Sequence, residues 1–302
     1  MKRFEQKQAG LLTSSELKTF RGQLMYWIFI LCLTVCVAIA LIPAIWTVSS
    51  ALKDSAEILD SSRFFPSSFS WSKLIGRLSS TWTSMNLSMP MMNTFIRSIG
   101  EVLFKIVICG LIGYSISKLK PTGSKALFVA IVWTMMLPSQ IRMVSNYIGW
   151  MHYPFAADNG LGVNLLDTFW PFWIGSAADC FGILLFKNAF DGLSDSYVEA
   201  AKIDGATNVG IFFRIMAPLS MPIIIYQSIM TFNVGWADYM GPLLYLNKTK
   251  TVPLVLYLAK TTNVKMNDQF MAYVISCIPP LIIFIIFQKQ ILGGVNVGGV
   301  KG

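Results

Sequence analysis

The sequence has little charge and few side chains that carry chemistry. Of its 302 residues only 13% are charged while 54% are hydrophobic, and the mean hydropathy is +0.58. Polar side chains in that proportion do not cover a water-soluble globule of this size, so the composition favours an integral membrane protein. The single histidine, His152, and five cysteines that lie in apolar runs without metal-ligand spacing predict neither a metal site nor disulfides.

Several functional classes are disfavoured by what is missing. The chain has no Gly-rich phosphate loop of the GxxxxGK[ST] type, so it is not expected to hydrolyse ATP. An intramembrane hydrolase needs a nucleophile with its base or a pair of aspartates, whereas Asp179 and His152 stand alone in the sequence. The net charge of +9 does not indicate nucleic acid, because the basic residues cluster at the ends of apolar runs.

Apolar runs dominate what is present. A bilayer crossing needs about 20 largely apolar residues. Six runs qualify or come close, at 24–46, 92–117, 126–150, 165–190, 219–239 and 270–287. The first is long and lacks a small-x-small exit, which favours a retained helix over a cleaved signal peptide. The sequence therefore predicts an all-α polytopic membrane protein with six transmembrane helices, kinked at Pro138 and at Pro279 and Pro280.

The basic residues predict the topology. The shorter connections that would share a side with the basic N-terminus carry Lys118, Lys120, Lys125, Lys187, Lys202 and Arg214. Positive charge in short loops marks the cytoplasmic side, and the lysines of the longer outer loops count weakly. We expect a multi-pass protein of the bacterial plasma (inner) membrane with both termini in the cytoplasm.

One polar stretch interrupts this pattern, "SYVEAAKIDGATNVGIFFRIMAPLSMPI" from Ser196. Ser196 and Glu199 have the spacing of a capping box, and Gly205 is a natural helix terminator. Thr207 is placed to cap a second helix. The stretch predicts two short cytoplasmic helices that meet at an angle. On these residues alone, an amphipathic connector lying at the membrane surface would have the same pattern.

Within this stretch, "EAAKIDGATNVGIFFRIMAP" resembles the EAA signature of permease subunits in binding-protein-dependent ABC importers. Ala217 stands where leucine is usual, and the matching residues are Glu199, Ala200, Ala201, Gly205, Ile215 and Pro218. Further segments resemble MalG-like carbohydrate permeases over nearly the whole chain, namely "IPAIWTVSSALKDSAEIL", "NTFIRSIG", "GYSISKLKPTGSKALF", "MMLPSQIRMVSNYIGW", "FGILLFKNAFDGL" and the terminal "GGVNVGGVKG".

The resemblance implies a type I ABC importer permease fold in a single domain, 1–302. Its parts would be a cytoplasmic segment at 1–23, a six-helix core at 24–292, an EAA loop at 190–218 with coupling helices between helices 4 and 5, and a cytoplasmic Gly-rich tail at 293–302. The EAA loop is implied to dock a separate ATPase through Glu199, Ala200, Ala201, Asp204, Gly205, Ile215 and Pro218. The implied tail contacts at the same interface are Gly298, Gly299, Val300, Lys301 and Gly302.

Function and partners follow from the same resemblance. The chain would be one permease half of an ATP-driven importer for a sugar or oligosaccharide, working by alternating access with a second homologous permease. It would be no enzyme and would need no cofactor, because ATP and Mg²⁺ would bind to two partner ATPase subunits. An extracellular or periplasmic sugar-binding protein would deliver the substrate, facing the outer loop at 241–267. One alternative is an importer for another solute, such as a polyol or glycerol-phosphate derivative. The other is an ion-coupled secondary transporter, a class that usually has internal repeats, and none is evident in this sequence.

Polar groups inside the apolar runs are candidates for the transport path. Arg97, Glu101 and Lys105 share one helical face, which predicts either a functional site or a self-neutralised stripe facing the partner permease or a water-filled vestibule. Asp179 has Arg142 as its candidate partner. Aromatic faces and amides or carboxylates suit sugars, although an interfacial aromatic belt has the same composition. The substrate-path candidates are Asn233, Trp236, Asp238 and Tyr239 in "FNVGWADYMGPL", with Asn93, Trp133, Gln140 and Asn146.

Overall fold

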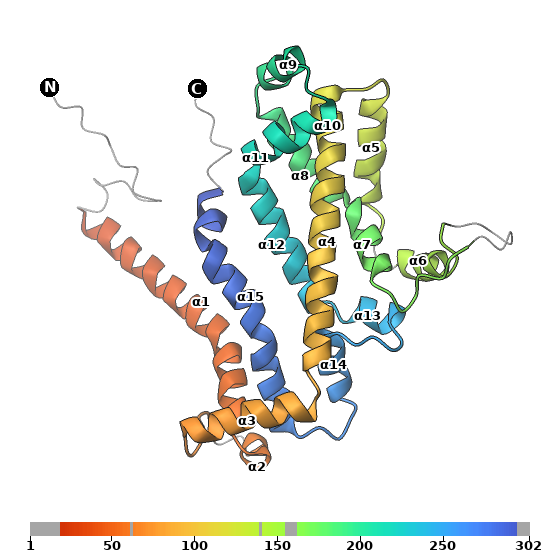
Figure 1. Ribbon diagram of the computed structural model, residues 1–302. Coiled ribbons are helices and arrows are strands. Elements are labelled where there is room, and N and C mark those ends of the chain that lie inside the picture. Colours follow the sequence, from red (N-terminus) through yellow and green to blue (C-terminus); the bar gives the residue numbers. More distant parts are fainter. Residues whose placement is uncertain (1–18, 61–62, 139–140, 155–161, 295–302) are drawn as a thin grey trace. The chain divides into compact units, whose positions relative to one another are not determined.

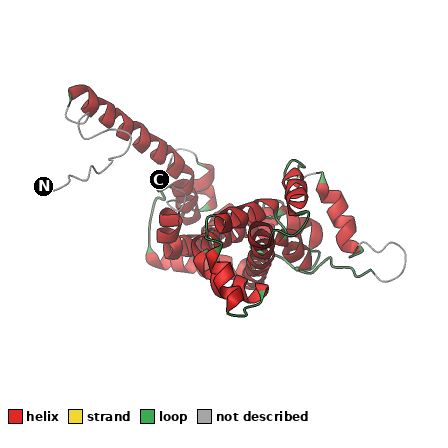
Figure 2. Cartoon of the chain, turned by 90° about the horizontal axis from the view of Figure 1, so that it is seen from above, coloured by secondary structure: helices red, strands yellow, loops and turns green. Residues whose placement is uncertain are grey.

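A computed structural model describes residues 19–60, 63–138, 141–154 and 162–294, without the side chains of 291–294. Over this part of the chain the regular elements are helices, which agrees with the predicted all-α class (Figure 2). The extended pairing among these residues is one isolated bridge between Tyr153 and Val163. The chain forms two compact units, one comprising 1–77 with 265–274 and the other 78–264 with 275–302.

The smaller unit contains the long first helix. Helix α1 (Phe20–Leu52) begins at Thr19, whose hydroxyl accepts a hydrogen bond from the Gly22 amide at 3.1 Å. Helices α2 (Ser55–Leu59) and α3 (Trp71–Ser84) follow it. Arg77 in α3 pairs with Asp54 and donates to the Ala51 carbonyl at 3.1 Å, so this ion pair ties α3 to the end of α1.

The larger unit is built around α4 (Ser88–Tyr114). It packs against α7 (Trp170–Ala177), α8 (Cys180–Asp191) and α12 (Met221–Ala237), as Figure 1 shows. Glycine allows the closest approach: a Cβ atom at Gly113 would lie 2.8 Å from Phe186 Cβ and 2.9 Å from the Lys187 amide nitrogen. The helix pair α4–α8 is therefore packed backbone to backbone at that point.

Two of the predicted apolar runs are not single helices. The run 126–150 divides into α5 (Ser124–Thr134) and α6 (Arg142–Met151), so the helix stops before Pro138 instead of kinking at it. A proline in a helix cannot donate to the carbonyl four residues earlier and clashes with it, and for Pro138 that residue is Thr134, the last residue of α5. The run 165–190 divides at Ala178, and α8 starts afresh with the Asp179 carboxylate accepting from the Gly182 amide at 2.8 Å. By contrast, Pro279 and Pro280 lie inside one helix, α15 (Met266–Gly294).

The number of membrane crossings therefore stays a prediction. In the described part of the chain, two helices are long and apolar enough to cross a membrane, Phe20–Leu52 and Met266–Gln290. A third span results if Asn208–Leu219 and Met221–Ala237, which meet at 84°, are counted together. Helix α4 has the length of a span but carries three ionisable residues in its interior.

Short elements occupy the two ends of α4. The π-helical turn η2 (Ser115–Leu119) continues it at one end, beside α9 (Ser196–Ile203), α10 (Asn208–Ile211), the π-helical turn η3 (Phe212–Met216) and α11 (Ala217–Leu219). At the other end lie α13 (Met240–Tyr245) and α14 (Val252–Ala259). Within this unit, α9 and α14 are at opposite ends of α4 (Figure 1).

Candidate functional site

The first helix of the EAA loop does not begin as the sequence predicted. The prediction that Ser196 caps it is wrong, because Ser196 lies in the first turn and Asp195 occupies the cap position. Asp195 forms no side-chain cap, since its carboxylate is paired with Lys118 from η2. Lys118 also donates to the Leu193 carbonyl at 2.6 Å. The hydrogen bond from Lys118 lowers the pKa of Asp195 below its ordinary value, so this connection to η2 is ionic.

The bend at Gly205 and the second cap are confirmed. Gly205 has φ +78°, and its amide donates to the Lys202 carbonyl at 3.0 Å while the Ala206 amide donates to the Ala201 carbonyl at 2.9 Å. These two bonds form the Schellman ending that requires a left-handed residue. The Thr207 hydroxyl then accepts from the Gly210 amide at 3.2 Å and starts α10.

The inner face of the EAA loop is buried against α4 and α8. Val198, Ala201, Ile211, Phe212 and Met216 belong to one apolar cluster with side chains of α4 and α8. The Phe212 ring lies 5.8 Å from that of Tyr114 in α4, and a Cβ atom at Gly110 would come within 2.9 Å of it. Ala201 thus packs on its own chain, whereas Ala200 is exposed, so the two alanines do not share the docking surface that the signature implied.

The outer face of the EAA loop is exposed and in part apolar. Glu199, Lys202, Asp204 and Pro218 are exposed, and Ile215 is half-buried. Three large apolar side chains accompany them: Ile203 is 87% exposed, Val209 59% and Phe213 51%. Sequence reasoning did not single out Ile203, although its place between Lys202 and Asp204 in a polar stretch was the available signal.

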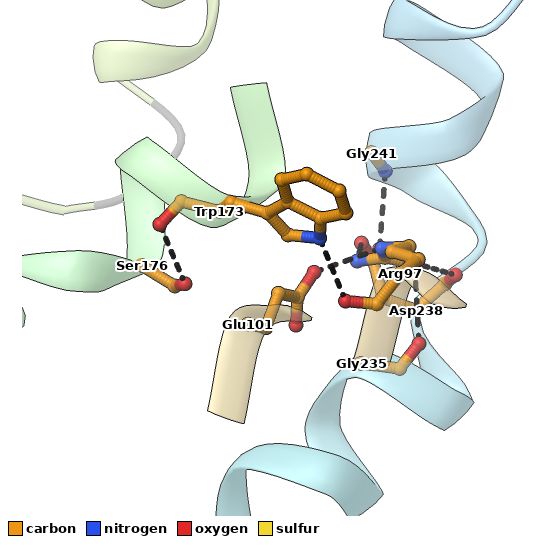
Figure 3. Close-up of polar contacts among 7 residues, drawn as sticks. All are labelled: Arg97, Glu101, Trp173, Ser176, Gly235, Asp238 and Gly241. Atoms are coloured by element: carbon orange, nitrogen blue, oxygen red, sulfur yellow. Dashed lines mark hydrogen bonds and ion pairs between the residues drawn. The ribbon is translucent and has the colours of Figure 1, made fainter. Parts of the chain in front are cut away.

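A cluster of charged residues joins α4 to the end of α12 (Figure 3). The Arg97 guanidinium donates to Glu101 Oε1 at 2.8 Å, to Asp238 Oδ2 at 2.6 Å, and to the carbonyls of Gly235 and Asp238 at 3.1 and 3.2 Å. Trp173 of α7 donates its indole N–H to the Arg97 carbonyl at 3.1 Å. Arg97 and Glu101 are only 3% and 5% exposed, so they neither face a vestibule nor form a stripe toward a partner.

Glycine again permits this arrangement. A Cβ atom at Gly235 would lie 2.6 Å from Glu101 Oε2. Because burial of a charge is tolerated only with partners, the four hydrogen bonds made by Arg97 and its contact with the Phe172 ring account for its position. The cluster fixes how α4, α7 and α12 meet.

Lys105 leaves the predicted stripe. Its ammonium lies 3.1 Å from Asp179 Oδ2, so the partner of Asp179 is Lys105 of α4 and the predicted pairing with Arg142 is wrong. Arg142 is exposed in α6. Asp179 thus has two roles in the structure, capping α8 and neutralising a lysine at the break between α7 and α8.

The substrate candidates near the end of α12 separate into two groups. Trp236 is 6% exposed, stacks on Phe232 at 5.2 Å and donates to the Ser276 carbonyl at 2.9 Å. Its ring is therefore covered by this chain, and Asp238 is held by Arg97. Asn233 and Tyr239 remain exposed. The Tyr239 ring stacks on that of Tyr257 at 4.6 Å, so one of its faces is already covered.

The other substrate candidates are scattered. Trp133 and Asn146 are exposed on α5 and α6. Asn93 is half-buried in α4 and donates to the Lys250 carbonyl at 2.9 Å. Gln140 and the tail residues 298–302 lie outside the described residues. A substrate role for each of these positions stays a prediction.

The described residues form long apolar helices with a polar helix pair fixed to one end of α4. The chain belongs to the family described as binding-protein-dependent transport system inner membrane component, whose profile matches residues 106–297. This confirms the resemblance seen in the EAA segment.

Individual relatives agree with the family. The chain is 27% identical to a probable ABC transporter permease protein, YurM, of Bacillus subtilis over 94% of this chain and 91% of that protein. It is 28% identical to the polygalacturonan/rhamnogalacturonan transport system permease protein YtcP of the same organism, over 70% of this chain and 76% of that one. Among solved structures, a chain of a bacterial ABC transporter involved in the import of the acidic polysaccharide alginate matches with a TM-score of 0.74 and 22% identity, covering 90% of this chain and 98% of that one. The last comparison shows a shared fold.

Proposed function

We propose that this chain is one of two permease subunits of an ATP-driven importer for a sugar or oligosaccharide, and that its EAA loop docks a separate ATPase. The observation that carries the proposal is the two-sided EAA loop. One face is buried against α4 and α8, while the other presents Ile203 at 87% exposure among charged residues. One exposed apolar side chain would be ordinary, but Ile203, Val209 and Phe213 are all exposed within one short segment among charged residues, and grouped apolar surface of this kind is typical of a protein contact site.

The loop is also joined to a membrane helix in a way that suits transmission of movement. The segment Asn208–Leu219 continues into α12 through Ser220 alone, at an angle of 84°. Its Phe212 ring fits against α4. A displacement imposed on this loop by a partner therefore acts on two helices at once, and this supports alternating access driven from the EAA end.

The choice of a sugar rests on the relatives. The permease YtcP is named for polygalacturonan and rhamnogalacturonan, and the transporter of the same fold imports alginate. Exposed Asn233 and Tyr239 supply an amide and an aromatic ring, the groups that bind sugar hydroxyls and C–H faces. The partners we propose are a second permease, two ATPase subunits and an external binding protein, with both termini of this chain in the cytoplasm.

The exposed side of α4 supports a further contact in the membrane. Met92, Ile96, Ile99 and Leu103 recur at helical spacing and are 41–60% exposed. Such a stripe fits either acyl chains or a helix of the second permease.

The experiment co-expresses the chain with a second permease, an ATPase and a sugar-binding protein from the same organism, purifies the complex through a tag on this chain and measures ATP-dependent sugar uptake in proteoliposomes. We expect the ATPase to co-purify and Ile203→Glu to remove it, because a carboxylate would replace the apolar contact. Val163→Glu introduces the same charge at an apolar side chain that is 59% exposed outside the EAA loop. It is the matched control and should change neither result. Retention of the ATPase on the Ile203→Glu complex with normal uptake would contradict the docking role.

A further inference from the structure

A pocket with polar walls lies at the end of α4 that is remote from the EAA loop. Its volume is about 490 Å³. The polar groups come from Asn86, Asn93, Lys248, Thr249 and Lys250, and aliphatic side chains of α4 and α14 complete the wall. This volume lies within the range of small-molecule sites, and amides beside an aliphatic wall match the hydroxyls and C–H surface of a sugar ring.

The backbone that carries the two lysines is held rigidly by one carboxylate. Asp167 Oδ1 accepts three successive amide hydrogen bonds, from Asn247 at 3.1 Å, Lys248 at 3.0 Å and Thr249 at 3.1 Å. The Asp167 amide in turn donates to the Tyr245 carbonyl at 2.7 Å. Asp167 adopts φ +61°, a strained conformation for a residue other than glycine. Such strain persists where the surrounding contacts require it, and here the contacts fix the loop.

Helix α4 holds the same loop from the other side. Asn93 donates its amide to the Lys250 carbonyl at 2.9 Å, and the Thr94 hydroxyl accepts from the Val252 amide at 2.9 Å. The amide of Asn93 is thus used through its nitrogen, which leaves its oxygen as an acceptor at the pocket. Lys248 and Lys250 are two residues apart on a fixed backbone at the pocket wall.

The wall carries a net positive charge. Both lysine side chains are exposed, and among the described residues neither forms an ion pair with a carboxylate. The stretch 239–267 contains four lysines and no aspartate or glutamate. Asp167 is near enough to Lys248 to offset part of this charge, but its Oδ1 accepts the three backbone amides and it forms no ion pair with either lysine.

We infer that this pocket binds an acidic sugar, with the acid group, a carboxylate or a phosphate, placed between Lys248 and Lys250. The inference rests on the proposed function and adds the charge of the substrate to it. A concave site with amide groups favours a sugar over an acidic protein surface, because two lysines that only docked a protein would need no pocket between them. The rigid loop reduces the ordering cost of binding.

The test uses the complete transporter with its binding protein in proteoliposomes. The probes are trigalacturonate, its methyl ester as the neutral counterpart of equal size, and glucose 1-phosphate as the phosphate-bearing probe. The variants are the double change K248Q/K250Q, the charge-preserving K248R/K250R and the control Lys125→Gln, which removes an exposed lysine of α5 outside both the pocket and the outer loop 241–267.

We expect the wild type to take up trigalacturonate or glucose 1-phosphate in preference to the ester, and the probe that is taken up identifies the acid group. K248Q/K250Q should raise the half-saturating concentration of that probe about tenfold, as loss of charge-assisted contacts does, without affecting the neutral ester. K248R/K250R and Lys125→Gln should behave as wild type.

Three results would overturn the inference, and they differ from failure of the proposed function. Equal weakening of acidic and neutral uptake by K248Q/K250Q, with a raised requirement for binding protein, would show that the lysines dock that protein. Uptake of neutral sugar with rejection of both acidic probes would leave the importer intact and refute the acidic site. Unchanged acidic uptake in K248Q/K250Q would do the same. Absence of ATP-dependent uptake of any sugar would instead refute the proposed function.

Discussion

Replacement of Gly205 by alanine, asparagine and aspartate distinguishes the local need for glycine from contact with a partner. Gly205 has φ +78°, and no atom of the described chain lies within 4 Å of the position that a Cβ atom would take. Inside this chain the penalty is therefore the left-handed backbone alone, about 1–2 kcal/mol for alanine and less for asparagine or aspartate.

A docked ATPase changes the order of these variants. Aspartate and asparagine have nearly the same shape, so the difference between them isolates the charge. An unpaired carboxylate buried in an interface costs about 3–5 kcal/mol, enough to remove the ATPase at ordinary concentrations. We expect the thermal stability of the permease alone to fall most for alanine, but ATPase binding and uptake to fall most for aspartate.

The assay measures the melting temperature of the permease pair, the ATPase retained on purification and the sugar uptake of each complex. Gly205→Asn serves as the matched control for Gly205→Asp. If Gly205→Asp keeps its ATPase and transports like Gly205→Asn, the surface beside Gly205 faces solvent and the docking argument is wrong. If all three variants lose the ATPase in proportion to their lost stability, Gly205 serves only the turn.

Three further predictions concern the unit around α4. Arg97→Met should lower the free energy of unfolding by about 3–5 kcal/mol, because it leaves two carboxylates near one another without their cation. Exposed Arg142→Met is the control and should have no measurable effect when the thermal unfolding of both variants is measured in detergent. Gly113→Ala should destabilise by about 1–3 kcal/mol through overpacking, since its Cβ atom would lie 2.9 Å from the α8 backbone, and an unchanged melting temperature would contradict the close contact. Lys118 lowers the pKa of Asp195, so their pairing stabilises the fold above the ordinary pKa of 3.8, and this stabilisation is lost as the pH falls through the lower pKa of the folded state. The melting temperature of Asp195→Asn should therefore lie below that of the wild type at neutral pH, and the two should become equal in acid.

Local features of the EAA loop were predictable from sequence. Gly205 ends a helix and Thr207 starts one because both effects involve a single residue and its own backbone. The cap at Ser196 failed although its spacing was correct. The Asp195–Lys118 pair, formed with a residue 77 positions away, anchors the chain one residue earlier.

Contacts between distant segments were not predictable in the same way. Asp179 pairs with Lys105 and not Arg142 because the break between α7 and α8 turns its side chain to α4. Trp236 has the composition of a sugar-binding residue, but its burial depends on Phe232 and Ser276 beside it. The role of Asp167 likewise required the fold, since three amides about 80 residues away meet its carboxylate.

The right-angle junction at Ser220 determines the direction in which the EAA loop can do mechanical work. Segment Asn208–Leu219 meets α12 at 84° with one residue between them, so the two behave as the arms of a lever with little slack. Twelve residues at 1.5 Å each give an arm of about 18 Å, and a rotation of about 10° at the junction moves its far end by about 3 Å. Forces parallel to the α12 axis at Asn208 thus become torque on α12, whereas forces along the arm only compress it. A partner that pulls along the arm would have far less leverage on α12 than one that pushes across it.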